Sequence, residues 1–306
     1  MSLNISLRHL LSIGDLTKSE FECIIKTAIE LKAEHRQKKK HSKLLTNKTL
    51  AMVFESHSTR TRISFEVAMN HLDGNAIVLP YGDSQLARGE SISDSAKVLS
   101  RYCDAILVRT KNHETLIEFA KYSSIPIING LSDKEHPCQV LADIMTIQEE
   151  FGSVKNKVIC WIGDCNNVFF SLVKASEICD FEIRIACPES IIQINKDYLI
   201  KQGVKASSNT ETMVRGADVV MTDVWLSMHH SESEQDERKK LFSPFKVTKQ
   251  IMKFANKNAI FLHCLPAKRD QEVEGDVIDG PTSRVWDEAE NRLHVQKSLL
   301  LKLMNF

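Results

Sequence analysis

The first residues that could do chemistry lie where a predicted strand passes into a predicted helix. Residues 49–54 form an apolar, strand-like run, and residues 58–62, with the sequence STRTR, open a run with helical spacing. The N–H groups of a helix N-terminus point at an anion, and Ser and Thr hydroxyls and an arginine fork add donors. We therefore expect a phosphate cradle here. A capping serine followed by surface arginines is the alternative, because so short a run is not specific by itself.

Reactive residue types also stand at four other predicted element ends. Arg109 and Asp223 each follow an apolar run, His136 opens a long helix, and Cys264 follows another apolar run. Ligands of parallel α/β sheets bind beyond the carboxyl ends of the strands, so we expect these positions to meet in one crevice between two domains. Each residue alone has another explanation, since His136 could be a structural histidine and Cys264 a buried core thiol.

Strands and helices alternate along the chain. Apolar runs predict strands, and helical spacing with capping signals predicts helices. The expected strands are residues 49–54, 76–79, 104–108, 125–128, 157–162, 182–187, 217–222 and 259–263. A first helix is expected to begin at residue 17. The other expected helices cover residues 59–72, 91–103, 113–122, 137–151, 167–179, about 195–202, about 246–255 and 287–303. The polar residues 231–240 are predicted to form a loop.

The alternation predicts the fold class. We expect an α/β protein of two domains, each a parallel sheet flanked by helices, joined by the long helix at residues 137–151. The domains are expected at residues 1–148 and 149–286. The C-terminal helix, about residues 287–306, is expected to pack back on the first domain.

Composition excludes several classes of protein. The 40 basic and 40 acidic residues leave a formal charge of +0, which argues against nucleic acid as a principal partner. No run approaches the ~20 apolar residues that span a bilayer, so no membrane is expected. The eight cysteines lack any C-x-x-C pair. They are expected to be free thiols in a cytoplasmic protein.

Several short motifs together resemble the aspartate/ornithine carbamoyltransferase family. The four strongest are STRT at residues 58–61, HPCQ at 136–139, DVWLSM at 223–228 and HCLP at 263–266. Further matches are residues 85–90, 129–133, 163–167 and 287–292. Their order and approximate spacing are similar to those of the family, and the resemblance covers nearly the whole chain.

The resemblance implies an enzyme and a reaction. The carbamoyl group of carbamoyl phosphate would pass to the side-chain amine of L-ornithine, giving L-citrulline and phosphate, as a step of arginine metabolism in the biosynthetic direction. No metal and no organic cofactor are implied. The expected partners are the two small-molecule substrates and further copies of the chain, as a homotrimer or a multiple of trimers.

The resemblance also assigns residues to roles. Those matching the carbamoyl phosphate site are Ser58, Thr59, Arg60, Thr61, Gln85, Arg109, His136, Gln139, Cys264, Leu265 and Arg292. Those matching the ornithine site are Asn167, Asp223, Ser227 and Met228. The expected catalytic residues are Asp223, Cys264, Arg109 and His136.

The chemistry explains why these types are needed. An alkylammonium has a pKa near 10.4, so the attacking amine must be bound or made as the free base, with Asp223 and Cys264 as the candidate groups beside it. Attack on the carbamoyl carbon makes an oxyanion that Arg109, His136 and the Thr61 hydroxyl can stabilise. The growing charge on the phosphate would be stabilised by the helix terminus.

Two other hypotheses stand beside carbamoyl transfer to ornithine. The acceptor could be another amine or amino acid, such as putrescine, N-acetylornithine or aspartate, although residues 227–228 and 263–266 favour ornithine. A nucleotide-binding oxidoreductase is disfavoured because residues 163–168, GDCNNV, lack the glycines of a dinucleotide fingerprint. The sequence departs from the family at His229, Ala87 and Cys165, where glycine is usual. His229 is expected to alter the hinge of its loop.

Overall fold

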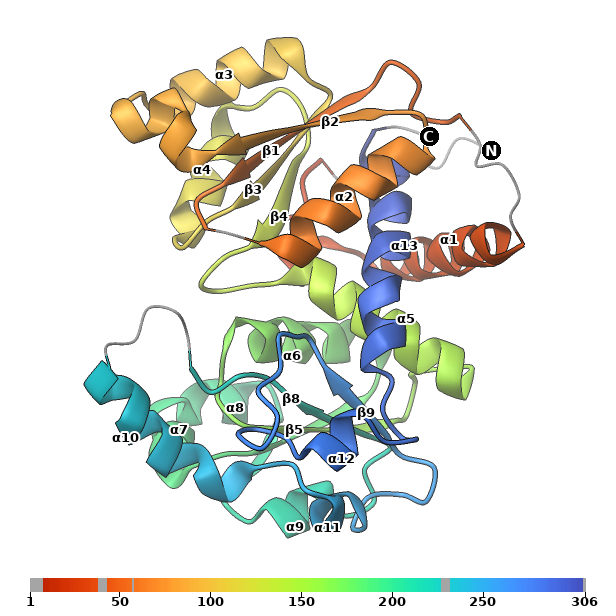
Figure 1. Ribbon diagram of the computed structural model, residues 1–306, viewed down its shortest axis with the longest axis vertical. Helices are drawn as coiled ribbons and strands as arrows, with labels where there is room; N and C mark the ends of the chain where they lie inside the picture. Colours follow the sequence, from red (N-terminus) through yellow and green to blue (C-terminus); the bar gives the residue numbers. More distant parts are fainter. Residues whose placement is uncertain (1–7, 38–42, 57, 227–231, 305–306) are drawn as a thin grey trace. The chain divides into compact units, whose positions relative to one another are not determined.

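The computed structural model describes residues 8–37, 43–56, 58–226 and 232–304 (Figure 1). The chain divides into two compact units, one formed by Met1–Met145 with Glu290–Phe306 and the other by Thr146–Ala289. Each unit is built on its own parallel sheet flanked by helices, so the predicted α/β fold class is confirmed. Residues 227–231, which include part of the DVWLSM motif, lie outside the described residues.

A four-stranded parallel sheet forms the centre of the N-terminal unit, in the order β2-β1-β3-β4. Its strands are β1 (Thr49–Phe54), β2 (Asn75–Pro80), β3 (Ala105–Arg109) and β4 (Ile127–Leu131). The inner strands β1 and β3 are almost wholly buried, as expected of strands covered on both faces. The edge strand β2 is partly exposed along its length.

Helices cover both faces of this sheet (Figure 1). They are α1 (Lys18–Arg36), α2 (Thr59–His71), α3 (Ile92–Tyr102), α4 (His113–Tyr122), the first part of α5 (Pro137–Phe151) and most of α13 (Val285–Leu303). On one face, Val53 and Ile106 of the sheet pack in one buried cluster with Phe119 of α4. Helix α1 begins at the predicted capping box, in which Thr17 accepts from the Glu20 N–H and Glu20 accepts in return from the Thr17 N–H.

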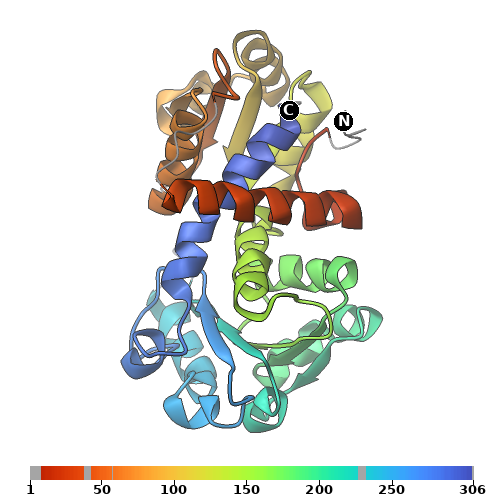
Figure 2. The ribbon, with the colours of Figure 1, turned by 90° about the vertical axis from the view of Figure 1, so that its right-hand side faces the viewer.

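The C-terminal helix α13 packs on the N-terminal unit, as predicted. Figure 2 shows α1 lying across it, and several hydrogen bonds join the pair. Ser298 Oγ donates to the Ile24 carbonyl at 2.8 Å, and Lys32 Nζ donates to Asn291 Oδ1 at 2.7 Å. This return places Arg292, which is distant in sequence, among the residues of the N-terminal unit.

The C-terminal unit has a five-stranded parallel sheet in the order β7-β6-β5-β8-β9. Its strands are β5 (Val158–Ile162), β6 (Glu182–Ala186), β7 (Lys205–Ser207), β8 (Val219–Thr222) and β9 (Ile260–His263). Residues of β5, β8 and β9, among them Cys160, Val220 and Phe261, belong to one fully buried cluster. Strand β7 was not predicted, because three residues are too short to show a period.

The helices of this unit include one that the sequence analysis placed in a loop. They are α6 (Asn167–Cys179), α7 (Glu189–Ile194), α8 (Lys196–Lys201), α9 (Thr210–Val214), α10 (Glu232–Phe242), α11 (Lys249–Met252) and α12 (Gly275–Ile278). The loop predicted at residues 231–240 was wrong, since α10 occupies most of it. Its sequence, ESEQDERKKLF, is polar all round and shows little apolar period, yet Phe242 at its end is fully buried. The expected helix at about 246–255 is reduced to α11.

Candidate active site

The site residues of the N-terminal unit lie at the point where its strand order reverses. From β1 the chain goes outward to β2 on one side and returns to β3 on the other, so the carboxyl ends of β1 and β3 are neighbours. The Glu55 N–H donates to the Arg109 carbonyl at 2.9 Å, and the Thr110 hydroxyl donates to Glu55 Oε2 at 2.6 Å. Such a switch point is where open α/β sheets bind their ligands.

The N-terminus of α2 opens at this switch point. Ser58 is its N-cap, and the Ser58 hydroxyl accepts from the Thr61 N–H at 3.3 Å. Thr59 is exposed and Arg60 is half-buried in the same first turn. The first-turn N–H groups and the helix dipole therefore favour an anion here, with an arginine beside them.

The Thr61 hydroxyl is a buried junction between two arginines. Arg292 Nη2 donates to Thr61 Oγ1 at 3.1 Å, and Arg109 Nη1 approaches the same oxygen at 3.5 Å. Arg292 Nη1 also donates to Gln139 Oε1 at 2.6 Å, and Gln139 Nε2 donates in turn to Asp143 Oδ1 at 2.8 Å. Arg292 is 3% exposed, so its charge is held in place by buried partners rather than by solvent.

His136 is a buried, neutral imidazole. Burial, and after it the positive charges of Arg292, Arg109 and Arg60, hold the pKa of His136 well below its ordinary value. A neutral ring keeps one N–H donor without adding positive charge. Such a group suits a hydrogen bond to a carbonyl oxygen that becomes an oxyanion.

Gly130 on β4 explains a motif whose role the sequence did not reveal. A Cβ at this position would lie 3.1 Å from Leu107 Cδ2 and 3.4 Å from Arg109 Cβ. Glycine thus lets β4 approach β3 closely beside Arg109. Gln85, by contrast, is exposed in the short helix η3 (Gln85–Arg88), and among the described residues no hydrogen bond joins it to the Thr61 junction.

The C-terminal unit has a switch point of its own, between β5 and β8. Asn166 follows β5, and its Nδ2 donates to Asp223 Oδ2, just beyond β8, at 2.7 Å. Asn166 is also the N-cap of α6, because its Oδ1 accepts from the N–H groups of Val168 and Phe169. One amide therefore orients Asp223 and starts the helix. Asn167, which was predicted to bind the amino acid, is the first residue of that helix.

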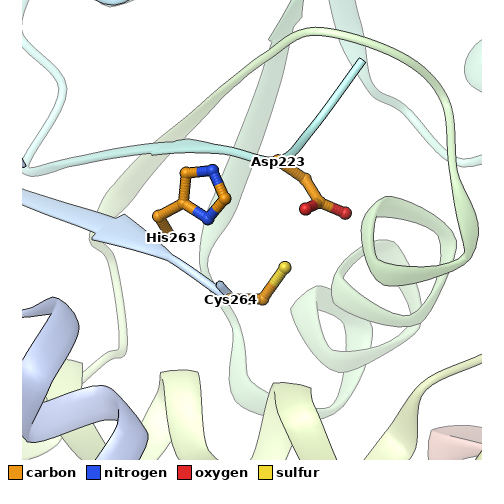
Figure 3. A group of neighbouring side chains, drawn as sticks. All are labelled: Asp223, His263 and Cys264. Carbon is orange, nitrogen blue, oxygen red and sulfur yellow. The ribbon is translucent and has the colours of Figure 1, made fainter. Parts of the chain in front are cut away.

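Asp223, His263 and Cys264 lie together at the ends of β8 and β9 (Figure 3). One atom of each side chain, an oxygen, a nitrogen and a sulfur, lies within 4.8 Å of the other two. Asp223 and Cys264, the two candidate groups for the amine, are therefore neighbours. Asp223 and Cys264 are half-buried, and His263 is fully buried.

Both ring nitrogens of His263 already form hydrogen bonds within the protein. Its Nδ1 accepts from the Leu265 N–H at 2.9 Å, so Nε2 carries the proton and donates to Glu272 Oε1 at 3.2 Å. Asp223, His263 and Cys264 have the ligand types of a metal centre, but a metal would have to break one of these bonds. The arrangement suits a structural histidine that holds the 263–266 turn. In that turn Leu265 has a left-handed φ of 56°.

The predicted site residues separate between the units. Ser58, Thr59, Arg60, Thr61, Arg109, His136, Gln139 and Arg292 belong to the N-terminal unit, and Asn167, Asp223, Cys264 and Leu265 belong to the C-terminal unit. Ser227, Met228 and His229 lie outside the described residues, so their predicted roles stay predictions. Ala87 and Cys165 stand where glycine is usual in the family, but neither has a positive φ angle. The positive φ angles near them fall on Gly89 and Gly163. No glycine is therefore required at those two positions.

The sequence analysis missed three residues of this chemistry. Asn166 and Asp143 each bind a predicted site residue, Asp223 and Gln139 respectively, and Glu272 binds His263 of the HCLP motif. Asn166 carried a signal, since an Asn before an apolar helical run is a capping pattern. Asp143 and Glu272 carried none, because their partners are set by folding and not by a local motif.

Taken together, the fold and its two switch points define an α/β enzyme with an anion cradle on one unit and an acid–thiol pair on the other. Residues 8–149 match the family described as "Aspartate/ornithine carbamoyltransferase, carbamoyl-P binding domain", and residues 155–303 match "Aspartate/ornithine carbamoyltransferase, Asp/Orn binding domain". The chain belongs to the aspartate/ornithine carbamoyltransferase family, and the resemblance read from its motifs is confirmed.

Individual relatives agree with the family. The chain is 48% identical over 295 residues to an ornithine carbamoyltransferase of Methylococcus capsulatus, covering 96% of this chain and 97% of that one. It is 46% identical over 312 residues to an ornithine carbamoyltransferase of Pyrococcus abyssi, covering 99% and 98%. The solved ornithine carbamoyltransferase of Pyrococcus furiosus is similar with a TM-score of 0.89 and 46% identity over 97% of each chain.

Proposed function

We propose that the protein is an ornithine carbamoyltransferase, which transfers the carbamoyl group of carbamoyl phosphate to the side-chain amine of L-ornithine and releases L-citrulline and phosphate. The observation that carries the proposal is the Thr61 junction, where a helix N-terminus and two arginines converge on one buried hydroxyl. The relatives named above support ornithine as the acceptor.

The phosphate of the donor binds at the first turn of α2. Ser58, Thr59, Arg60 and Thr61 supply N–H groups, hydroxyls and one guanidinium, and Arg109 adds a second. A dianion gains from the dipole and from charge-assisted hydrogen bonds, which contribute about 1.5–3 kcal/mol each. Gln85, exposed on η3, is proposed to serve the same substrate in a neighbouring subunit.

The carbamoyl oxygen binds beside His136 and Arg109. When the amine attacks, the carbonyl becomes an oxyanion, and the neutral imidazole N–H and the Arg109 guanidinium stabilise its charge. Gln139 stays oriented for the carbamoyl group because Arg292 and Asp143 hold its two amide atoms. The family resemblance also assigns Cys264 and Leu265 to carbamoyl phosphate, and we keep these two roles as proposals.

The amine of ornithine is handled by the C-terminal unit. Asp223, oriented by Asn166, attracts the substrate's ammonium group, and Cys264 lies in the same cluster. Only the free base can attack, so the ammonium group first gives one proton to solvent. As the new C–N bond forms and the C–O bond to phosphate breaks, a second proton leaves the nitrogen and goes to the departing phosphate. Asn167 is proposed to bind the amino-acid end, with Ser227 and Met228 as further predicted contacts.

The wider assignments are proposals as well. We infer a role in arginine biosynthesis and a cytoplasmic location, in keeping with eight free cysteines. Within the described residues, no helix has both the length and the apolar character needed to cross a bilayer. No metal or organic cofactor enters the proposed chemistry.

We also propose a homotrimer or a multiple of trimers. Three large apolar side chains of the N-terminal unit, Ile63, Ile77 and Tyr81, are 40–51% exposed on α2, β2 and the segment after β2. Exposed apolar groups on neighbouring elements are typical of subunit contacts. Light scattering coupled to size exclusion tests this, and a monomer at micromolar concentration would contradict it.

A citrulline assay with carbamoyl phosphate and a panel of amines tests the proposed reaction. Ornithine should give the highest kcat/KM, well above putrescine, N-acetylornithine and aspartate. A higher kcat/KM with one of the other amines would assign the protein to a different acceptor, and no carbamoylated product with any of them would reject the proposal.

A further inference from the structure

Arg238 on α10 joins the two loops that form the switch point of the C-terminal unit. Its Nε donates to the Trp225 carbonyl at 2.9 Å, and its Nη2 donates to Asp164 Oδ2 in a short ion pair. Asp164 follows β5 and Trp225 follows β8. One guanidinium on α10 therefore bridges the loop after β5 and the loop after β8, which lie about sixty residues apart in the chain.

The same two loops carry Asn166 and Asp223. Asn166 stands two residues after Asp164, and Asp223 stands two residues before Trp225. The Asn166–Asp223 hydrogen bond at 2.7 Å and the Arg238 bridge are thus two cross-links between the same pair of loops. Among the described residues no hydrogen bond joins Arg238 to Asp223, so any effect of Arg238 passes through the loop backbone.

The bridge is anchored rather than free to swing. The Arg238 guanidinium lies 4.9 Å from the centroid of the Phe242 ring, and that ring stacks on Trp225 at 6.1 Å with an interplanar angle of 24°. Trp225, Leu226 and Phe242 form a small buried cluster. On the other loop, Trp161 Nε1 donates to the Asp164 carbonyl at 2.9 Å. Both attachment points of Arg238 are therefore fixed by packing or by a further hydrogen bond.

Arg238 and Asp164 are shielded from water enough for the pair to matter. Their side chains are 21% and 24% exposed. Exposed ion pairs on this unit contribute little, whereas a partly buried arginine that satisfies both a carboxylate and a carbonyl is costly to remove. A lysine has one point charge in place of a planar fork and cannot span both partners equally well.

We propose that Arg238 is a positioning residue for the amino-acid substrate. By holding Asp164 and Trp225, it fixes the spacing of the two loops and so the orientation of the Asn166–Asp223 pair toward the amine. This rests on the proposed function, in which Asp223 binds ornithine. It assigns a role in substrate binding to α10, whose sequence by itself predicted only a solvated loop.

The test compares Arg238→Met and Arg238→Lys with the wild type and with Arg269→Met. Arg269 is a matched control, because it makes two hydrogen bonds to Asp279 in the same unit but is 45% exposed. Steady-state rates of citrulline formation give KM for ornithine, KM for carbamoyl phosphate and kcat, and thermal unfolding gives Tm for each variant.

Arg238→Met should raise KM for ornithine about tenfold or more and change KM for carbamoyl phosphate less than about twofold. Arg238→Lys should recover part of the loss, and Arg269→Met should match the wild type. Equal increases in both KM values, or an unchanged ornithine KM in folded Arg238→Met, would overturn the inference.

If Arg238→Met does not fold, Asp164→Asn removes one partner with little change of shape and should show the same selective rise in ornithine KM, by several-fold. An unchanged KM there would also overturn the inference. If the wild type makes no citrulline, the proposed function fails first, which separates the two outcomes.

Discussion

The two switch points of this molecule have the same topology and opposite chemistry. In each unit the strand order reverses between two neighbouring strands, β1 with β3 in one and β5 with β8 in the other, and the following loops carry the polar groups. The N-terminal switch point gathers donors and positive charge from Thr61, Arg109 and Arg292. The C-terminal switch point offers an acid and an amide, Asp223 and Asn166, and the Cys264 thiol lies beside Asp223 after the neighbouring strand β9.

In both units the sheet determines where a ligand binds, and the loops determine which ligand binds. A site rich in donors accepts a phosphate, whereas a site with a carboxylate accepts an ammonium group. We therefore expect substitutions at one switch point to affect one substrate and to leave the other substrate's affinity nearly unchanged.

Removing Arg292 should have the largest effect. Arg292→Met deletes two charge-assisted hydrogen bonds, to Thr61 and Gln139, in a site with almost no access to solvent. At about 1.5–3 kcal/mol each, kcat/KM for carbamoyl phosphate should fall by about 10² or more. Steady-state kinetics measure this, with Arg284→Met, which breaks an ion pair to Glu150 at the surface, as the control. A loss confined to ornithine KM would break the comparison.

Asp223→Asn should produce the matching defect on the other side. The amide keeps the shape but loses the charge that attracts the substrate's ammonium, so kcat/KM for ornithine should fall tenfold to about a hundredfold. Equilibrium titration should find carbamoyl phosphate binding within about twofold of the wild type. Weakened carbamoyl phosphate binding in this variant would show that the two switch points do not act on separate substrates.

Arg60→Gly should have a smaller effect than Arg292→Met. Arg60 is half-buried and supplies one guanidinium to a cradle that keeps its helix terminus, so activity should fall by about an order of magnitude. The loss should appear as a raised KM for carbamoyl phosphate and should shrink as ionic strength rises, because salt screens the charge that the wild type supplies. Full activity in Arg60→Gly would show that the phosphate does not bind at the N-terminus of α2.

The smallest expected effect is on the pH dependence of donor binding. Because the pKa of His136 lies well below its ordinary value, the folded protein keeps this ring neutral where an unfolded histidine, with a pKa near 6.5, binds a proton. Carbamoyl phosphate affinity should therefore show no His136 titration between about pH 6 and 8. By the same sign, His136 lowers stability as pH falls below about 6.5.

The ornithine side should differ, since kcat/KM for ornithine should climb through that range as the amine loses its proton. Parallel measurement of both substrates between pH 6 and 8 checks the contrast. A step of His136 near pH 6.5 in donor binding would mean that the ring is exposed to solvent in the working enzyme.

The fold was largely predictable because its strands are buried on both faces. Runs such as residues 50–54 and 105–108 are apolar without interruption, which is what a covered parallel strand requires. Helix α10 escaped prediction because it is polar all round and is held by a few contacts of Arg238 and Phe242 instead of an apolar stripe.

The site was predictable only in part, for a related reason. The N-terminus of α2 can be predicted from the local sequence, which has a capping serine and an arginine beside it. The place of Arg292 beside Thr61 depends on α13 returning to the N-terminal unit, and no spacing rule reveals a pairing of residues 231 positions apart. The Asn166–Asp223 bond likewise depends on which strands become neighbours.

The most direct test of the division between the two switch points is calorimetric titration of carbamoyl phosphate into the wild type, Arg292→Met and Asp223→Asn, with inorganic phosphate as a stable second probe. We expect Arg292→Met to lose carbamoyl phosphate affinity by about tenfold or more and Asp223→Asn to bind carbamoyl phosphate like the wild type. Equal weakening in both variants, or normal binding in Arg292→Met, would contradict this division.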